Sequence, residues 1–463
     1  MRYLPHTQDE IQSMLQQIGV KDVDALFDSI PQDLKLNRPL KLPTPLSELE
    51  LRNELRSISR QNAHGEDWSV FLGGGAYSHY IPSVVSQILL RGEFLTAYTP
   101  YQPEISQGTL QAIFEYQTLV CEILGLDVAN ASHYDGSTAT AEAALMALNL
   151  TGRKKILVAR NLHPEYREVL KTYVHSGLGE IEEIPFTDEG TLDRKILKAK
   201  LNDTVACVIA AVPNFFGIFE DVSEIASEVH QAGGLLITST TEPLAFGLFK
   251  SPGEMGADIA VAEGQSFGNT ISFGGPNLGL FAVKKEYVRA MPGRLVGETV
   301  DAAGQRGFVL TLATREQHIR RERASSNICT NVSLCALAAT ITLSLWGKKG
   351  FQDLAQMNFE KSAEVRHQLT KISGVQPRFS GTSFNEFVVK LPSAPERVIP
   401  SLLQSNVIPG IPLGTWYPEL KDCLLVCVTE MNTEEQVRKL VNGLTATLLS
   451  SSPLTPESES NGQ

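Results

Sequence analysis

A proline-stiffened stretch of tyrosine and polar side chains, residues 95–108, concentrates hydrogen-bonding groups in a short length of chain. Tyr98 and Tyr101 can present hydroxyls and ring faces at small conformational cost, because prolines at positions 100 and 103 restrict the backbone around them. Further donors and acceptors come from Thr99, Gln102, Glu104 and Gln107. One interpretation is a loop that offers hydrogen bonds at a reaction site. The other, equally weighted on residue types alone, is a helix capped by Ser106 beside packed tyrosines.

A second stretch of chemical interest is the Gly- and Ser-rich segment 262–279, which lies between two apolar runs and contains no lysine. Its pattern, with Ser266-Phe267 and Gly274-Gly275-Pro276, resembles the place where pyridoxal phosphate (PLP) enzymes of the aspartate aminotransferase type carry their cofactor-linking lysine. The corresponding residue here is Gln265, whose neutral amide cannot form an imine with an aldehyde. The resemblance therefore implies a PLP-type fold that has lost its nucleophile.

A helix start at residues 135–144 offers a candidate anion site. The amides and hydroxyls of Gly136, Ser137 and Thr138 precede a strong helix, where free N–H groups can bind phosphate. In PLP enzymes of this type the cofactor phosphate binds at a comparable place, so we expect a relic phosphate cup. An ordinary helix N-cap is the alternative interpretation.

The segment 235–241 indicates a second loss. PLP enzymes of this fold usually end this strand with an aspartate that pairs with the pyridine nitrogen and keeps it protonated. Here the strand ends in hydroxyl residues, and the nearest carboxylate, Glu242, precedes Pro243, where it can simply cap a turn. His133 could stack on a ring, although a lone histidine beside a turn is more often structural.

Several further motifs resemble one family, the P-protein (glycine dehydrogenase, decarboxylating) of the glycine cleavage system. They span nearly the whole chain: residues 73–82, 98–104, 106–108, 116–118, 263–265 and 323–330. In some bacteria this protein is split into two homologous polypeptides, and the chain resembles the N-terminal one, subunit 1. The resemblance implies that subunit 2 carries the lysine and the PLP.

The same resemblance implies a glycine-catabolising complex. Glycine would lose carbon dioxide at the PLP of subunit 2, and the aminomethyl group would pass to the lipoyl arm of the H-protein. We expect a heteromer with two copies of each subunit, working with the T-protein and L-protein, in which the tyrosine loop contributes to the partner's active site. Two alternatives stay open: a pure scaffold or regulatory subunit, and a stand-alone PLP lyase. The second is disfavoured because the nearest lysines, Lys250, Lys284 and Lys285, lie outside the loop.

Composition restricts the class of protein further. The 463 residues carry a net charge of -12 without a long basic run, which argues against nucleic-acid binding. No segment reaches the ~18 apolar residues of a membrane helix, and residues 1–6 contain no apolar signal core, so we expect a cytoplasmic protein. The spacing of the six cysteines indicates neither a zinc site nor a disulfide framework, so we expect buried thiols and no metal site. The six are Cys121, Cys207, Cys329, Cys335, Cys423 and Cys427.

The elements that must position these groups alternate between strand and helix. Short apolar runs at 155–159, 204–212, 235–237 and 258–262 are separated by helical stretches such as 223–232. Strands buried on both faces have this appearance, so we expect a mostly parallel sheet between helix layers. The resemblance to PLP enzymes makes this the α/β large domain of fold type I, followed by a smaller α+β domain.

We expect four regions along the chain. Residues 1–65 form a helical and extended arm, 66–325 the large domain, 326–449 the small C-terminal domain, and 450–463 a disordered tail rich in Ser, Pro and Glu. Within the arm, a capped helix ends at Gly19 and a second follows at 47–62, on either side of the proline-rich segment 36–46. Near 331–346 a buried helix leads to a hinge. Three consecutive glycines, 73–75, favour a backbone turn over a phosphate loop.

Overall fold

The structure, a computed structural model, describes residues 5–36, 38–63, 67–175 and 177–450. The chain divides into two compact units, 1–63 and 64–463. The division lies close to the predicted end of the arm at residue 65. The predicted boundary between large and small domains near 325 stays an interpretation. The predicted tail lies outside the described residues, except that the last helix continues through Ser450.

The first unit contains two capped helices. α1 (Gln8–Ile18) begins at a capping box between Thr7 and Glu10 and ends at Gly19, whose φ of 86° is the left-handed conformation that glycine tolerates. After η1 (Asp24–Phe27), α2 (Glu48–Ser59) begins at a second capping box, formed by Ser47 and Glu50. Both helices confirm the sequence prediction. Most apolar side chains of this unit are exposed, among them Ile18, Leu34, Leu42, Leu49 and Leu55.

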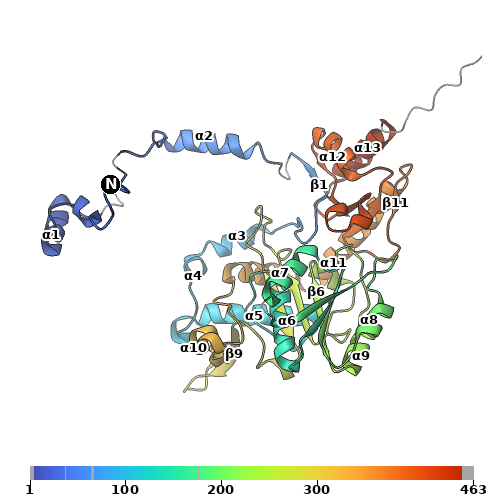
Figure 1. Cartoon of the computed structure of the whole chain (residues 1–463), viewed down its shortest axis with the longest axis horizontal. Coiled ribbons are helices and arrows are strands. Elements are labelled where there is room, and N and C mark those ends of the chain that lie inside the picture. Colours follow the sequence, from blue (N-terminus) through green and yellow to red (C-terminus); the bar gives the residue numbers. More distant parts are fainter. Residues whose placement is uncertain (1–4, 37, 64–66, 176, 451–463) are drawn as a thin grey trace, which may run out of the picture. The chain divides into compact units, whose positions relative to one another are not determined.

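A seven-stranded sheet forms the centre of the second unit (Figure 1). Its order is β2-β8-β7-β6-β5-β3-β4. The five strands from β7 to β4 are parallel, whereas β8 runs antiparallel to β7 and β2 antiparallel to β8. This confirms the mostly parallel sheet. The strand bounds are β2 (Val128–Ala129), β3 (Lys155–Ala159), β4 (Glu180–Ile184), β5 (Val205–Ala211), β6 (Leu235–Thr240), β7 (Ile259–Glu263) and β8 (Gly279–Val283).

Helices cover both faces of this sheet, because successive side chains of each strand point to opposite sides. On one face, Ile156, Val158 and Ile209 pack against α6 (Gly136–Thr151) and α7 (Pro164–Val174). On the other, Leu157 and Val208 pack against α8 (Arg194–Lys200) and α9 (Ser223–Gln231). Figure 1 shows these two helices beside the sheet. The β7–β8 side of that face is covered by α5 (Gln107–Leu124) and α11 (Ser333–Thr370).

The C-terminal part contains a smaller antiparallel sheet of order β11-β12-β15-β14. Its strands are β11 (Gln376–Pro377), β12 (Glu386–Lys390), β14 (Ile411–Pro412) and β15 (Cys423–Cys427). α12 (Pro395–Gln404) and α13 (Glu434–Ser450) pack together beside it. The N–H of Gln436 donates to Oγ1 of Thr433 at 3.3 Å and the N–H of Thr433 donates to Oε1 of Gln436 at 2.9 Å, so α13 begins at a capping box.

The long helix α11 is broken at Gly347, where φ is 58° and ψ is -176°. The break falls directly after the predicted helix 331–346 and confirms where that helix ends, while the hinge between domains stays a prediction. A short parallel pair, β1 (Ser69–Val70) and β13 (Val407–Ile408), links the start of the second unit to the C-terminal part. The remaining elements are α3 (Ser83–Leu89), α4 (Gly92–Leu95), η2 (Pro103–Ile105), η3 (Pro243–Gly247), η4 (Lys285–Tyr287), β9 (Leu295–Val300), β10 (Arg306–Thr311), η5 (Ala313–Arg315), α10 (Gln317–Arg320), η6 (Arg321–Arg323), η7 (Leu413–Thr415) and η8 (Pro418–Leu420).

The cysteines differ in their surroundings. Cys207, Cys335, Cys423 and Cys427 are buried, and Cys121 is half-buried, as expected for core thiols. Cys329 is exposed, and the prediction of a buried thiol is wrong there, because the residue lies in an irregular loop. Within the described ranges, no helix combines the length and apolar character required to cross a membrane.

Candidate functional site

Gln265 lies in the turn after β7 and is only 2% exposed. Its Oε1 accepts a hydrogen bond of 2.8 Å from the backbone N–H of Tyr77, and its Nε2 donates one of 2.6 Å to the carbonyl of Asn269. Both ends of the amide are therefore satisfied within the chain, as a buried polar group requires. The position expected to have lost its lysine holds an amide that connects two loops.

The helix start expected to be a relic phosphate cup holds two carboxylates of the chain itself. Thr138 N–H donates to Oδ1 of Asp135 at 2.7 Å, and the Ser137 hydroxyl lies 3.0 Å from the same carboxylate. Gly136 N–H donates to Oε2 of Glu263 at 3.0 Å. Two amides of the expected cup thus already have carboxyl partners. The capping interpretation accounts for these contacts without a phosphate.

Glu263 is the less expected of the two carboxylates, because it comes from β7 and is 2% exposed. Its Oε1 accepts hydrogen bonds from Leu278 N–H at 2.9 Å and Gln265 N–H at 3.1 Å. Burial raises its pKa to about 8, although the backbone hydrogen bond from Gly136 works in the opposite direction. The side chain thereby fills the space where an anionic ligand would meet the helix.

Glu242, expected only to cap a turn, belongs to a buried cluster. It caps η3 through Leu244 N–H at 3.1 Å, and its other oxygen accepts from the Ser266 hydroxyl at 2.8 Å. Nε2 of His79 lies 3.0 Å from that same oxygen. The Nδ1 atom of His79 lies 2.8 Å from Oε2 of Glu430, in the C-terminal part. One imidazole thus bridges two carboxylates.

His79 is held in its charged form by these partners. Burial lowers the pKa of the imidazole, but the charges and hydrogen bonds of Glu242 and Glu430 outweigh burial and raise the pKa to about 10. Burial raises the pKa of the Glu430 carboxyl, but its hydrogen bond and charge interaction with His79 outweigh burial and lower the pKa overall. A cation between two buried carboxylates is therefore the expected state at neutral pH.

The triple glycine allows the chain to enter this cluster. A Cβ on Gly73 would lie 2.2 Å from Oε1 of Glu386, and Gly74 and Gly75 have φ values of 68° and 101°. Gly74 N–H donates to Oε1 of Glu386 at 2.6 Å, and the Tyr77 hydroxyl donates to its Oε2 at 2.7 Å. The turn interpretation is confirmed. Burial raises the pKa of Glu386 to about 7.

His133 is structural in its contacts. Its ring stacks on Phe281 with centroids 4.8 Å apart and an interplanar angle of 19°. Burial lowers its pKa to about 3, so the ring is neutral. The histidine thus packs against a side chain of β8.

PLP does not fit this pocket. The position that the sequence resemblance assigns to an imine-forming lysine holds Gln265, and the helix start is met by Glu263. Where the resemblance places a pyridine-pairing aspartate, the end of β6 and the residue after it are Thr240 and Thr241. Thr240 itself donates to the carbonyl of Val212 at 2.5 Å. The chain's own hydrogen bonds have replaced the cofactor's contacts.

The tyrosine loop lies elsewhere, between α4 and α5. Tyr98 is 85% exposed, and Thr99 is half-buried. Gln102 and Glu104 are exposed, so these side chains are available to another molecule. Gln107 has a structural role: its Oε1 accepts from Phe308 N–H at 2.8 Å and its Nε2 donates to Phe308 C=O at 2.9 Å. The prediction treated Gln107 as part of the loop's polar set without this pairing to β10.

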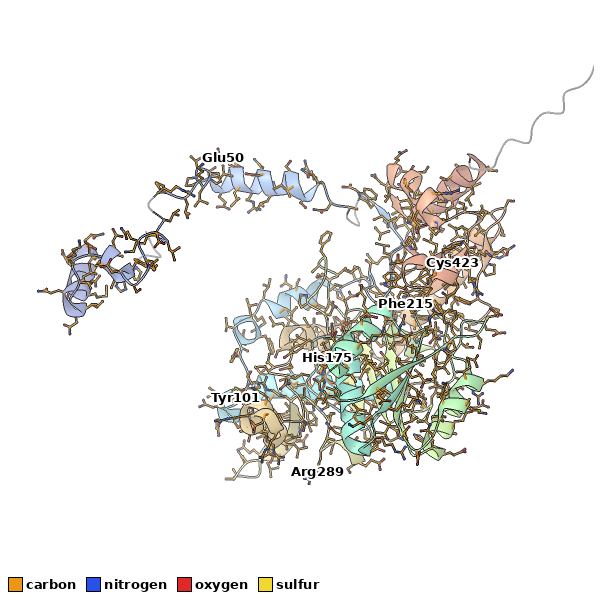
Figure 2. All side chains as sticks on the ribbon, viewed as in Figure 1. Glu50, Tyr101, His175, Phe215, Arg289 and Cys423 are labelled. Atoms are coloured by element: carbon orange, nitrogen blue, oxygen red, sulfur yellow. The ribbon has the colours of Figure 1, made fainter. Side chains whose placement is uncertain are left out.

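Tyr101 is fixed more firmly than Tyr98. Nη2 of Arg294 donates to its hydroxyl oxygen at 3.0 Å, and the ring meets the imidazole of His318 on α10 edge-on, with centroids 5.6 Å apart. Figure 2 shows Tyr101 in this part of the second unit. Arg294 was missed by sequence reasoning, since nothing in the Pro-Gly-Arg segment indicates a partner 193 positions earlier.

Comparison with solved structures identifies the fold class of this chain. A sphingosine-1-phosphate lyase of Burkholderia pseudomallei superposes with a TM-score of 0.64 at 13% identity, covering 90% of this chain and 93% of that one. This likeness shows fold type I, the fold of a large group of PLP-dependent enzymes. The prediction of the fold class is confirmed.

The chain belongs to the glycine cleavage system P-protein family, whose model matches residues 1–444. The crystal structure of a glycine decarboxylase (P-protein) in inhibitor-bound form has a TM-score of 0.88 at 42% identity, covering 97% of this chain and 100% of that one. A probable glycine dehydrogenase (decarboxylating) subunit 1 of Desulfitobacterium hafniense is 51% identical, over 96% of this chain and 99% of that protein. Its counterpart in Desulforamulus reducens is 50% identical, with 96% and 100% covered.

Proposed function

We propose that this chain is the noncatalytic subunit of a heteromeric glycine dehydrogenase (decarboxylating), acting with subunit 2 in the cytoplasm. The observation that carries the proposal is Gln265, a buried amide with both ends hydrogen-bonded, at the lysine position of a P-protein fold. A chain without the nucleophile requires another polypeptide to supply it. Two relatives that are 51% and 50% identical to this chain are named subunit 1, which supports a protein divided into two subunits.

In this proposal PLP belongs to subunit 2, where it would supply the electron withdrawal that makes loss of carbon dioxide from glycine possible. The lipoyl arm of the H-protein receives the aminomethyl group, and the T-protein and L-protein act on later steps. The task of this chain is to orient groups and exclude water at the shared site.

The loop 98–107 is the part of this chain that we assign to that task. Tyr98, Gln102 and Glu104 have exposed side chains that can reach a second polypeptide. The Gln107 amide anchors the loop to β10 through both hydrogen-bonding atoms of Phe308, so the polar groups are presented from a fixed base. A preorganised loop loses little conformational entropy on binding.

Co-expression with subunit 2 tests the assembly. An obligate pairing of unlike halves typically buries more than ~2,000 Å², so the two chains are expected to elute together in size exclusion and to decarboxylate glycine only as the pair. Two separate monomer peaks at micromolar concentration would contradict the proposal. Coelution without any effect of the loop residues on turnover would leave a scaffold in its place.

A further inference from the structure

We propose that Tyr101 and Tyr134 form a pair of hydrogen-bond donors for an oxyanion, a carboxylate or phosphate group, at the site shared with the second subunit. The inference rests on the proposed function and extends it to Tyr134 and Arg294. It starts from the direction of the hydrogen bonds around residues 329 and 330.

Arg294 determines whether the Tyr101 hydroxyl donates or accepts a hydrogen bond within the chain. The guanidinium is 4% exposed and lies near the ring, with Cζ 5.4 Å from the centroid. An arginine can only donate, so at 3.0 Å from Nη2 the phenol oxygen is the acceptor. The phenolic proton is consequently left for another group. Within the described part of the chain, no acceptor for it is found.

The Tyr134 hydroxyl also accepts a hydrogen bond from the chain. The backbone N–H of Cys329 donates to its hydroxyl oxygen at 3.1 Å. An N–H cannot accept, so the Tyr134 proton is also free to donate, and the described residues offer it no acceptor either. Tyr134 is 36% exposed and Tyr101 is 51% exposed. Both hydroxyls can therefore meet a group that arrives from outside the chain.

The backbone of one residue, Cys329, connects the two hydroxyls through Arg294. Nη2 of Arg294 donates both to Tyr101 and to the carbonyl of Cys329, the latter at 2.8 Å, while the N–H of Cys329 holds Tyr134. Nη1 of Arg294 donates to Oγ1 of Thr330 at 2.7 Å. The segment 329–330 is thus tied to both hydroxyls, to that of Tyr134 directly and to that of Tyr101 through Arg294.

The chemistry of this arrangement suits an anionic acceptor. The two phenols present two O–H groups that can donate to the same anion, because their oxygens already accept hydrogen bonds from the chain. The buried guanidinium of Arg294 adds positive charge close to them. Glu316 moderates that charge, since its Oε2 lies 3.6 Å from Nε of Arg294. In the proposed reaction two small molecules carry oxyanions, namely the carboxylate of glycine and the phosphate of PLP.

The test uses the assembled heteromer with Tyr101→Phe and Tyr134→Phe. Binding of glycine and of methylamine, which lacks the carboxylate, is measured by titration calorimetry without H-protein, and PLP release is followed by absorbance. Because hydrogen bonds to charged groups contribute about 1.5–3 kcal/mol, each variant is expected to weaken one ligand about 10-fold or more. Weaker glycine but unchanged methylamine assigns the carboxylate, and faster PLP release assigns the phosphate.

Arg294→Lys tests the positioning role, because lysine keeps the charge and loses the planar fork that makes three contacts. It is expected to weaken the same ligand, with little added effect in a Tyr101→Phe background. Tyr417→Phe is the matched control. The Tyr417 hydroxyl also accepts from an arginine, Arg167 at 3.4 Å, but its own proton is already donated to Arg160 C=O at 3.0 Å. We expect unchanged ligand binding in that variant.

Unaltered glycine affinity and PLP release in both tyrosine variants would overturn the donor pair. Reduced turnover in Tyr101→Phe with no effect of Tyr134→Phe on either ligand would also overturn it, while leaving the proposed function intact. Unaltered turnover in every variant of the loop 98–107 would instead remove the proposed contribution to the partner's site.

Discussion

The backbone N–H of Tyr77 donates a hydrogen bond of 2.8 Å to Oε1 of Gln265, across 188 positions of sequence. The contact occupies the side chain at the position that the sequence resemblance assigns to the lysine of PLP enzymes. It also fixes the loop after the triple glycine, whose next residues reach Glu386 and Glu242 through Tyr77 and His79. Gln265, Tyr77 and Glu386 thus form a junction between the sheet and the C-terminal part.

This junction predicts that the isolated chain forms no specific adduct with PLP. Incubation with PLP, reduction with borohydride and peptide mapping are expected to show no stoichiometrically labelled lysine. The physical reason is the neutral amide at Gln265, which cannot attack an aldehyde. A single strongly labelled lysine in the pocket would contradict the assignment.

Restoring the lysine is expected to cost stability without producing activity. Gln265→Lys removes the acceptor of Tyr77 N–H and buries a cation, and leaving a buried donor unpaired costs about 1–3 kcal/mol. Independent glycine decarboxylation is not expected, since Glu263 still meets the helix start and no aspartate follows β6. Urea unfolding measures the stability change.

The matched control for that variant is Gln111→Lys, on the exposed surface of α5. Its effect on the free energy of unfolding is expected to stay within about 0.5 kcal/mol. Equal stability of the two lysine variants, or decarboxylation by Gln265→Lys alone, would show that the buried amide is dispensable.

The imidazole between Glu242 and Glu430 predicts a pH-dependent stability. The pKa of His79 is raised from 6.5 to about 10 in the folded chain. A raised pKa means that the stabilisation is fully present below about pH 6.5 and is lost as pH rises towards 10. Removing one partner of a buried charge pair costs about 3–5 kcal/mol, so His79→Gln is expected to be strongly destabilised near pH 6.

Urea unfolding of wild type and His79→Gln across this range checks the sign. The difference between the two free energies of unfolding is expected to shrink as pH approaches 10. A difference that stays constant or grows with pH would show that the histidine is not held as a cation by its two carboxylates.

Sequence reasoning predicted what local patterns determine and missed what distant contacts determine. The run at 155–159 coincides with β3, and the helix end at 346 with the break at Gly347, because alternation of apolar runs and a glycine in the left-handed region are local signals. His79, Glu242 and Glu430 meet from three separate segments. No spacing in the sequence indicates such a meeting.

The candidate site shows the same limit. Gln265 was expected to be inert, but its hydrogen bond to Tyr77 depends on a loop folded from another part of the chain. Gln107 was grouped with the polar donors and acceptors of the loop, and its pairing with the backbone of Phe308, 201 positions later, was missed. The hydrogen-bond partner of such a glutamine can be identified only from the tertiary structure, which brings β10 beside it.

The tyrosine hydroxyls predict an effect on rate that leaves assembly intact. In the heteromer, Tyr98→Phe or Tyr101→Phe keeps the ring and removes one hydrogen-bonding group. Loss of a hydrogen bond formed in the transition state costs roughly 1 to 3 kcal/mol, or about 5- to 150-fold in turnover. Glycine decarboxylation and coelution with subunit 2 are the two measurements.

Tyr287→Phe, at the end of η4, is the control for removing a phenolic oxygen outside the loop. Its turnover is expected to match wild type. Wild-type rates with normal assembly in both loop variants would take their hydroxyls out of the mechanism and favour the scaffold.

The most direct measurement of the central claim is glycine-dependent exchange of labelled bicarbonate into the glycine carboxyl group, in the presence of H-protein. It is carried out with this chain alone, with subunit 2 alone, and with the two combined. The account predicts exchange only in the combined sample, and coelution of both chains in that sample. Exchange by this chain alone would contradict the loss of catalytic capacity at Gln265, and full exchange by subunit 2 alone would contradict any contribution of this chain to the shared site.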